Sequence, residues 1–166
     1  MKKPEDGSAP VLYVDADGCP FKEEIIAVAH ALRILVVFAC AQPHPRLAGR
    51  EGVEVLDVGD EFQAADERIL ALLKSGDAVA SGDLALARAV LERGAHAIGW
   101  RGIFTSHNIS EALARRDLAE TARAHQGWRE PAKPARAVGL SKADGARFKS
   151  ELNNLLARLL PQKPTP

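Results

Sequence analysis

Short apolar segments alternate with segments of helical periodicity along this chain, and that alternation constrains its fold more than any other feature. The segment Ile34–Ala39 is an unbroken apolar run of strand length, which is typical of a strand buried on both faces of a sheet. Strands that alternate with helices form a parallel sheet through right-handed crossovers. The sequence therefore predicts an α/β fold of three layers, with a mostly parallel five-stranded sheet and helices on both faces.

The bounds of the expected elements follow from apolar periodicity and from residues that end helices. The strands are expected at Val11–Val14, Ile34–Ala39, Val53–Val58, Ala78–Ala80 and Ala95–Ile98, and the helices at Phe21–Leu32, Glu61–Lys74, Leu84–Glu92, Thr105–Arg123 and Lys142–Leu160. They fill a single domain, residues 11–160, between loose tails at residues 1–10 and 161–166. A connector rich in proline and alanine, Pro131–Gly139, precedes the last helix.

Composition limits the class of protein. Hydrophobic residues make up 46% of the chain, which allows a packed core, and no run of about 18 apolar residues suggests a membrane span. The formal net charge is zero, which disfavours a protein that coats nucleic acid by bulk electrostatics. The two cysteines have no metal-ligand spacing, so we expect a cytoplasmic protein without disulfides. The basic residues between 129 and 149 fit either solvated helix faces and linker or a local phosphate contact.

Aspartates follow two of the expected strands at the point where each strand ends. Asp15 and Asp17 come directly after the first strand, and Asp83 follows the fourth. Ligands of an open parallel sheet bind beyond the carboxyl ends of its strands, so these carboxylates converge if the two strands are neighbours. Asp66, in the first turns of the helix before the fourth strand, can face the same edge. Crowded carboxylate oxygens suit Mg²⁺ or Mn²⁺, and the sequence predicts such a site.

A second interpretation explains the aspartates one at a time. Asp17, Asp60 and Asp83 stand at expected helix starts, where N-capping alone accounts for an aspartate. Capping explains Asp15 less well, because it lies at a strand end. The candidate metal ligands are therefore the set Asp15, Asp17, Asp66 and Asp83.

Five further polar residues are candidate substrate contacts: Ser81, Arg101, Thr105, Asn108 and Arg116. Each has a structural alternative, since Ser81 can hold the Asp83 turn, Asn108 can cap a helix and the arginines can lie in solvent. Cys19 precedes a helix, where a thiol pKa can fall, but burial as a small apolar group is the favoured interpretation. The five histidines have no metal-ligand spacing, and none is predicted to be a ligand.

Motifs spread over nearly the whole chain occur in one order. The chain carries Val14-Asp15-Ala16-Asp17-Gly18-Cys19-Pro20, then Ala65-Asp66-Glu67-Arg68-Ile69, then Gly76-Asp77-Ala78-Val79-Ala80-Ser81-Gly82-Asp83-Leu84-Ala85-Leu86-Ala87. Later come Arg101-Gly102, Phe104-Thr105, Asn108-Ile109, Arg116-Asp117-Leu118 and Lys142-Ala143-Asp144 with Phe148. In this order, from about Val11 to Leu160, they resemble the YaiI/YqxD family of uncharacterised bacterial proteins.

The resemblance implies a fold and a chemistry, because that family is itself similar to PIN-like nuclease domains. Such domains use acidic residues on a parallel sheet to bind Mg²⁺ or Mn²⁺ and cut RNA, and they often pair, which implies a homodimer. Carried over by position, Asp15, Asp66 and Asp83 would be the catalytic set and Asp17 an auxiliary metal ligand. Gln63 stands where the family often has an acidic residue, so one outer carboxylate is missing.

Three functions are compatible with these residues. The first is a divalent-metal-dependent nuclease that acts on RNA in preference to DNA, with the metal stabilising charge on the scissile phosphate. The second is a haloacid-dehalogenase-like phosphatase with Asp15 as nucleophile and Asp17 as acid and base, although the sequence offers no well-placed lysine. The third is a non-catalytic module whose acidic edge holds a metal or a partner without turnover.

Overall fold

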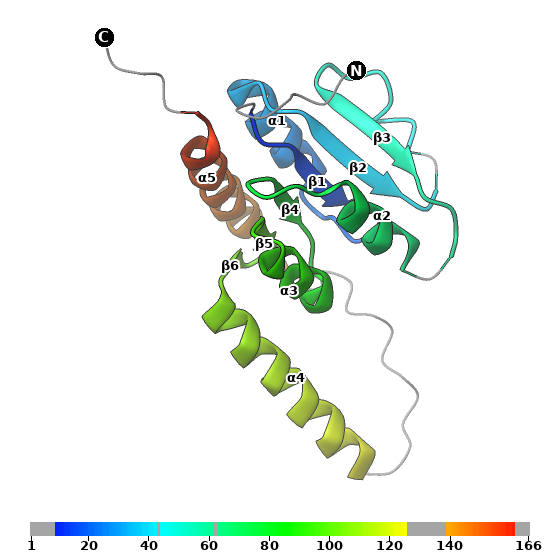
Figure 1. Cartoon of the computed structure of the whole chain (residues 1–166), viewed down its shortest axis with the longest axis vertical. Coiled ribbons are helices and arrows are strands. Elements are labelled where there is room, and N and C mark those ends of the chain that lie inside the picture. The colour runs from blue at the N-terminus through cyan, green and yellow to red at the C-terminus, as the bar shows by residue number, and fades with distance from the viewer. Residues whose placement is uncertain (1–8, 43, 62, 126–138, 162–166) are drawn as a thin grey trace.

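The computed structural model describes residues 9–42, 44–61, 63–125 and 139–161, and these residues form a six-stranded sheet in the order β3-β2-β1-β4-β5-β6 (Figure 1). The strands are β1 Leu12–Asp15, β2 Val36–Cys40, β3 Val53–Asp57, β4 Ala78–Ala80, β5 His96–Gly99 and β6 Gly102–Phe104. The helices are α1 Lys22–Leu32, α2 Ala64–Leu72, α3 Leu84–Glu92, α4 Ser106–His125 and α5 Lys142–Leu159. Strands β1 to β5 are parallel, and β6 is antiparallel to β5.

Two hydrophobic cores lie on the two faces of the sheet and give the fold its three layers. Helices α1 and α5 pack on one face, where Ile25, Phe148 and Leu152 join the inward side chains of β1 and β2. Helices α2, α3 and α4 pack on the other, through residues such as Ile69 and Val90. The predicted three-layer α/β architecture is therefore confirmed. Among the described helices, none combines the length and the apolar character needed to cross a membrane.

The sixth strand was missed, and the prediction of five strands is wrong. Strand β6 follows β5 through a tight turn at Trp100 and Arg101, with Gly99 paired to Gly102. A Cβ on Gly99 would lie 2.7 Å from the Phe104 ring, so the ring packs directly on the glycine and a side chain at position 99 would displace it. Because β6 has only three residues and begins with glycine, its apolar pattern was too short to be recognised.

The predicted bounds are correct where the start and stop signals are local. Strand β4 and helix α3 have the predicted ends, whereas α2 is shorter at both ends than the predicted Glu61–Lys74. The chain enters α2 through Gln63, whose φ of 62° is left-handed, and leaves it at the extended Leu73. Phe62, residues 1–8 and 162–166 of the predicted tails, and residues 131–138 of the predicted connector lie outside the described residues.

The strand order creates a topological switch point between β1 and β4. From β1 the chain moves outward to β2 and β3, then crosses back to place β4 on the other side of β1, with Val14 paired to Ala80. In open parallel sheets, ligands bind beyond the carboxyl ends of the strands at such a point. The two strands that end in the candidate aspartates are therefore neighbours, as the sequence required.

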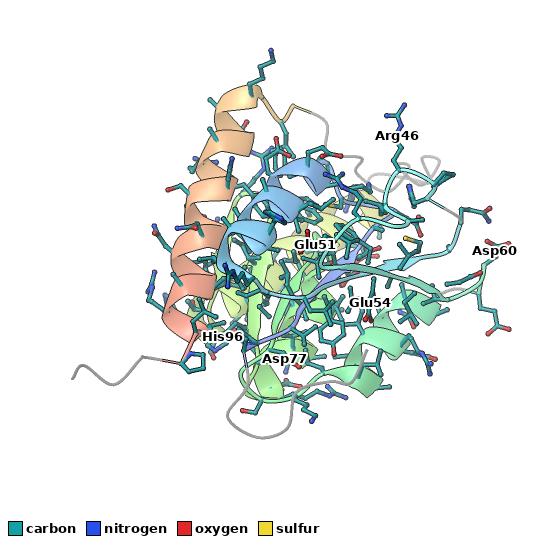
Figure 2. The ribbon with its side chains drawn as sticks, turned by 90° about the horizontal axis from the view of Figure 1, so that it is seen from above. Arg46, Glu51, Glu54, Asp60, Asp77 and His96 are labelled. Atoms are coloured by element: carbon teal, nitrogen blue, oxygen red, sulfur yellow. The ribbon has the colours of Figure 1, made fainter. Side chains whose placement is uncertain are left out.

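Asp77 fastens the same two strands at their opposite, amino ends. Its buried carboxylate accepts hydrogen bonds from the backbone N–H of Val11 (3.0 Å) and of Lys74 (2.8 Å). Figure 2 shows Asp77 close to His96, whose backbone N–H donates to the Asp77 carbonyl at 2.9 Å. Asp77 is therefore a structural residue, at the opposite end of β4 from Asp83.

Candidate functional site

Carboxylates from three separate elements influence one another at the carboxyl ends of β1 and β4. Burial is the largest cause of the raised pKa of Asp15, and the charges of Asp17 and Asp83 add to it. Burial, followed by the charges of Asp83 and Asp15, raises the pKa of Asp66 to about 6. Charges shift a neighbour's pKa in this way only over short distances. The structure thus places Asp15 near Asp17 and Asp83, and Asp66 near Asp83 and Asp15, and we call these four residues the aspartate cluster.

Asp15 is the last residue of β1, and the turn after it folds back over the carboxylate. The backbone N–H groups of Asp17 and Gly18 donate hydrogen bonds to Asp15, which lowers its pKa and partly opposes the effect of burial. A Cβ on Gly18 would lie 3.6 Å from Asp15 Oδ2, so the turn passes close to the carboxylate. Asp15 is therefore held by backbone dipoles within a crowded acidic environment.

Asp83 is the N-cap of α3, as the helix-capping interpretation of the aspartates predicted. Its Oδ1 accepts hydrogen bonds from the backbone N–H of Ala85 (2.7 Å) and Leu86 (2.9 Å). Ser81 is buried, and its hydroxyl accepts from the Asp83 backbone N–H at 3.0 Å, so Ser81 holds the turn rather than facing a substrate. Asp83 Oδ2 has no hydrogen bond to any described residue, which leaves one oxygen for another ligand.

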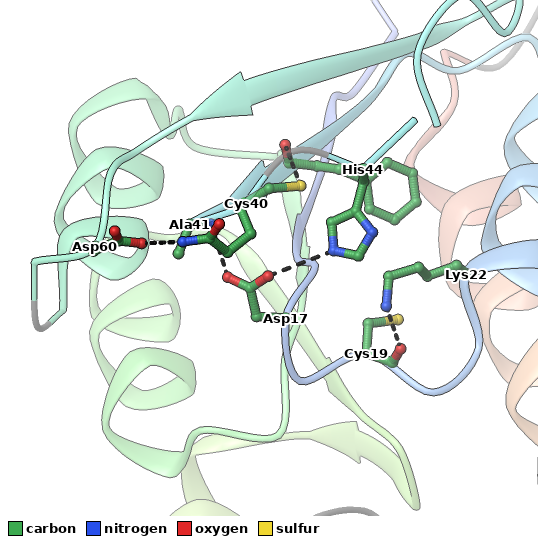
Figure 3. Close-up of polar contacts among 9 residues, drawn as sticks. Asp17, Cys19, Lys22, Cys40, Ala41, His44 and Asp60 are labelled. Atoms are coloured by element: carbon green, nitrogen blue, oxygen red, sulfur yellow. Dashed lines mark hydrogen bonds and ion pairs between the residues drawn. The ribbon is translucent and has the colours of Figure 1, made fainter. Parts of the chain in front are cut away.

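Asp17 does not cap a helix, and this part of the capping interpretation is wrong. Helix α1 starts at Lys22 with Phe21 at its N-cap, four residues further along. Asp17 Oδ2 instead accepts from the Ala41 backbone N–H at 2.8 Å, and Oδ1 lies 3.5 Å from His44 Nε2 (Figure 3). Asp17 therefore joins the turn after β1 to the loop after β2. Asp60 is likewise no cap, since α2 begins at Ala64.

Two basic residues near the cluster were missed by the sequence analysis. Lys22 donates to the Cys19 carbonyl at 2.7 Å (Figure 3). The charges of both Lys22 and Asp15 act on the pKa of Cys19. A lysine in the first turn of a helix opposes the helix dipole, and that local mismatch was the available signal. His44 gave no signal, because it is distant from Asp17 in the sequence and only the folded chain brings the two side chains together.

Neither cysteine has the character of a nucleophile. Burial raises the pKa of Cys19 to about 12, and burial followed by the charge of Asp17 raises the pKa of Cys40 to about 11. A thiol needs a lowered pKa to react at neutral pH. The interpretation of Cys19 as a small buried apolar group is confirmed.

Thr105 and Asn108 form a reciprocal cap at the start of α4. Asn108 Oδ1 accepts from the Thr105 backbone N–H at 2.8 Å, and the Thr105 hydroxyl accepts from the Asn108 backbone N–H at 3.2 Å. Asn108 Nδ2 also donates to the Ile103 carbonyl at 2.9 Å. Their polar groups are engaged by the backbone, so the structure favours the capping role over a substrate contact.

The two candidate arginines occupy different surroundings. Arg101 lies in the turn between β5 and β6, and its charge contributes to the lowered pKa of Asp144 at the start of α5, after the Ser141 backbone and hydroxyl and Arg147. Arg116 is exposed in the second half of α4, on the helix that runs away from the sheet (Figure 1). The structure therefore gives no contact between Arg116 and the aspartate cluster.

Three aromatic side chains, Trp100, Phe21 and Phe148, pack together behind the turn that contains Asp83. Trp100 meets Phe21 edge-on with ring centroids 6.5 Å apart, and Phe148 with centroids 5.8 Å apart. A Cβ on Gly82 would lie only 2.6 Å from Trp100 Nε1, so the indole rests directly on the glycine. A side chain at position 82 would therefore have to displace Trp100, and this packing supports the turn next to the cluster.

The donor set of the cluster fits a hard divalent cation, although the carboxylates do not form a closed cage. Carboxylate oxygens are what Mg²⁺ and Mn²⁺ prefer. Within the described part of the chain, no three histidine, cysteine or acidic side chains are grouped closely enough to hold an ion by themselves. Mg²⁺ characteristically uses one or two carboxylates together with waters and substrate phosphates, so an open arrangement suits it.

Comparison with known proteins decides the family. A family model described as an uncharacterized BCR, YaiI/YqxD family matches residues 13–158. The chain belongs to the YaiI/YqxD family. A UPF0178 protein of Sphingopyxis alaskensis is 36% identical over 155 residues, which covers 92% of this chain and 96% of that protein. One from Rhodospirillum centenum is 37% identical over 151 residues, covering 87% and 94%.

The match confirms the predicted resemblance and extends from the second residue of β1 to the last but one residue of α5. A third relative, a UPF0178 protein of Burkholderia lata, is 35% identical over 150 residues and covers 89% of this chain and 96% of that protein. No solved structure matches the chain. Membership of the YaiI/YqxD family brings no activity with it, so the function has to be argued from the chemistry of the aspartate cluster.

Proposed function

We propose that this protein is a divalent-metal-dependent nuclease of PIN-like character that hydrolyses RNA in preference to DNA. The supporting observation is the aspartate cluster at the topological switch point of the sheet. Burial is the largest cause of the raised pKa of both Asp15 and Asp66, and repulsion by neighbouring aspartates adds to it, so placing these carboxylates here costs free energy in the absence of a cation. Functional sites are where such costs are commonly found.

The roles of the residues follow from their surroundings. Asp15 and the second oxygen of Asp83 would hold Mg²⁺ or Mn²⁺, with Asp17 near the edge of the site. The ion would stabilise charge on the phosphate and provide a water of lowered pKa. With a pKa of about 6, Asp66 is mostly ionised at neutral pH and can accept a proton from an attacking water. The positive charge of Lys22 is suited to contact the phosphate of the substrate.

Cleavage of single-stranded RNA tests the proposal. The wild-type protein, Asp15→Asn and Asp83→Asn are incubated with a labelled oligoribonucleotide and Mn²⁺ or Mg²⁺, with excess chelator as a blank. Asp117→Asn is the matched control, because it makes the same change on the exposed face of α4. We expect metal-dependent cleavage by the wild type and the control, and its loss by a factor of 100 or more, about 3 kcal/mol of transition-state stabilisation, in the other two. Cleavage that survives in Asp15→Asn would contradict the proposal.

A non-catalytic metal- or partner-binding module is the second candidate. It is favoured by the engagement of Asp83 Oδ1 in the α3 cap and by the open spacing of the carboxylates. Titration with Mn²⁺ separates the two functions. Binding that is weakened in Asp15→Asn, with no cleavage of any RNA or DNA tried, would favour the module.

The phosphatase gains one supporting observation, because Lys22 lies near Cys19 in the surroundings of Asp15, whereas the sequence suggested no well-placed lysine. In that mechanism the Asp15 carboxylate attacks phosphorus directly. Hydrolysis of p-nitrophenyl phosphate, together with a beryllofluoride adduct on Asp15, would identify it.

A further inference from the structure

A small hollow lies beside the aspartate cluster, at the carboxyl ends of β2 and β3. Its volume is about 220 Å³. Its walls are mainly apolar and are formed by Cys40, Pro45, Ala48 and Val55. Polar side chains stand among them, from Gln42, His44 and Asp57. We propose that this hollow receives one unpaired nucleobase of the RNA whose phosphate lies at the aspartates, an inference that rests on the proposed nuclease function.

The hollow is joined to the aspartate cluster by direct contacts. His44 lines the hollow, and its Nε2 lies 3.5 Å from Asp17 Oδ1 (Figure 3). The Ala41 backbone, between Cys40 and Gln42 of the hollow, donates to Asp17 Oδ2 at 2.8 Å. A ligand held at the cluster therefore has this hollow as its immediate neighbour on the β2 side.

The register of the sheet shows how the hollow and the aspartates are placed. Asp15 pairs with Ala39 of β2, and the next residue, Cys40, pairs with Asp57 of β3. Successive side chains of a strand point to opposite faces, so Cys40 and Asp57 face the α1 side of the sheet, whereas Asp15 faces the side of α2 and α3. The hollow and the cluster therefore meet beyond the carboxyl ends of the strands, where Asp17 contacts His44. A nucleotide with its base in the hollow would have its phosphate at these strand ends.

The exposure of Val55 shows that the hollow is open to a ligand. Among the described residues, the exposed large hydrophobic side chains are Val55, at 38%, and Leu118. Val55 lies on the edge strand β3, where its side chain faces the same side of the sheet as Val53, which packs on the α1 core. Covering an exposed apolar surface of this kind with a flat ring displaces water, and this contributes favourable free energy to binding.

The polar residues suit the edges of a base. His44 presents an imidazole ring on which a base can stack, as aromatic side chains do in proteins that bind single-stranded RNA. Asp57 Oδ1 accepts from the Gly59 backbone N–H at 3.0 Å, whereas Oδ2 has no hydrogen bond to a described residue. That oxygen and the Gln42 amide can pair with the donors and acceptors of a base edge. Bases in a duplex are stacked and paired, so the hollow selects an unpaired nucleotide.

Nucleotide binding without metal and without cleavage tests the hollow independently of the nuclease activity. The probes are adenosine, guanosine, cytidine and uridine 5′-monophosphates, added to ¹⁵N-labelled full-length protein and followed by amide chemical shifts. Val55→Trp fills the hollow from the strand, and Ala48→Leu narrows it from the loop. Glu54→Trp is the matched control, because it places the same side chain next to Val55 on the opposite face of β3, where Figure 2 labels Glu54.

We expect at least one of the four nucleotides to shift the amides of Cys40, Ala48 and Val55, and to bind about tenfold or more weakly to Val55→Trp. Ala48→Leu should weaken binding in the same direction, and Glu54→Trp should leave it unchanged. Thermal unfolding of each variant shows whether it is folded. If Val55→Trp does not fold, the Ala48→Leu result decides in its place.

Three results would overturn the inference. Nucleotides that shift only the turn after β1, with equal affinity for both variants, would mean that the phosphate alone is recognised. Absence of any shift at millimolar nucleotide would mean that the hollow takes no base. A wild-type dimer that Val55→Trp dissociates, without any effect on nucleotide binding, would mean that a second copy of the chain covers the edge strand. Base binding without RNA cleavage would contradict the nuclease proposal but leave the hollow in place.

Discussion

Asp66→Asn should stabilise the metal-free protein at neutral pH, and the effect should vanish in acid. Burial and the charges of Asp83 and Asp15 raise the pKa of Asp66 from 3.8 to about 6. The folded state therefore holds the Asp66 proton more tightly than the unfolded state does. This contribution to stability is fully present below pH 3.8, and it is lost as the pH rises through about 6.

The size of the effect comes from the pKa shift. About two pK units correspond to about 3 kcal/mol, and because Asp66 is only partly buried, solvent screening reduces this to about 1 to 2 kcal/mol. The Asp66 side chain makes no hydrogen bond or ion pair with the described residues, so asparagine loses no such contact. For a chain of this length, the gain corresponds to a rise in melting temperature of about 3 to 6 °C at pH 7.

Thermal unfolding in chelator at pH 4, 5, 6 and 7 measures this difference. Glu67→Gln is the control, since it removes an exposed carboxylate from the same turn of α2. We expect the stability difference between Asp66→Asn and the wild type to grow steadily between pH 4 and pH 7, and the control to show almost none. If Asp66→Asn is no more stable than the wild type at pH 7, the carboxylates of the cluster do not repel one another in the folded protein.

Saturating Mn²⁺ should make the wild type more stable than Asp66→Asn, the opposite of the order expected without metal. A cation that binds the folded protein offsets the repulsion and stabilises it in proportion to its affinity. The wild type should therefore gain more from saturating Mn²⁺ than Asp66→Asn does. An equal gain in stability in both proteins would mean that Asp66 does not interact with the bound ion.

Three further outcomes are expected from the packing of the described residues. Asp77→Ala should cost about 2 to 4 kcal/mol in urea unfolding, because two buried backbone N–H groups lose their acceptor, and a cost below about 1 kcal/mol would contradict the role assigned to Asp77. Gly82→Ala should displace Trp100 at a cost of about 1 to 3 kcal/mol, visible as a shift in tryptophan emission, and unchanged emission and stability would contradict that contact. Amides of α4 beyond residue 114, around the 70%-exposed Leu118, should exchange hydrogen quickly, whereas slow exchange would indicate that a second copy of the chain covers this helix.

The sequence predicted those parts of the fold whose signals are local. Helix α3 has its cap at Asp83 and its stop near Gly94, so both of its ends were predictable, as was the buried run that became β2. The start of that strand was placed too early, because Ile34 belongs to the end of α1, where its backbone N–H donates to the Ala29 carbonyl at 2.9 Å. The exact start of a strand such as β2 depends on tertiary packing and cannot be predicted from apolar periodicity alone.

The candidate site was predictable to the extent that it depends on strand ends. A parallel sheet brings together the residues that come after neighbouring strands, so the sequence predicted that Asp15 and Asp83 share one edge if their strands are neighbours, and the strand order of the structure meets that condition. His44 could not, because it lies in a loop whose path is set by contacts such as the Asp17 hydrogen bond to Ala41. Trp100 could not either, since its position over Gly82 depends on the unpredicted hairpin of β5 and β6.

The engagement of Asp83 in the α3 cap limits what the aspartate cluster can do without a cation. One oxygen of Asp83 satisfies two backbone donors, which is sufficient reason for an aspartate at that position. Capping does not explain Asp15 or Asp66, whose raised pKa values show that the fold tolerates unfavourable charge beside Asp83. An asparagine at either position would keep much of the shape and remove the repulsion. Asp15 holds the turn after β1 and Asp83 caps α3, but the Asp66 carboxylate makes no hydrogen bond to the described residues, so Asp66 is the strongest argument that the charge itself is used.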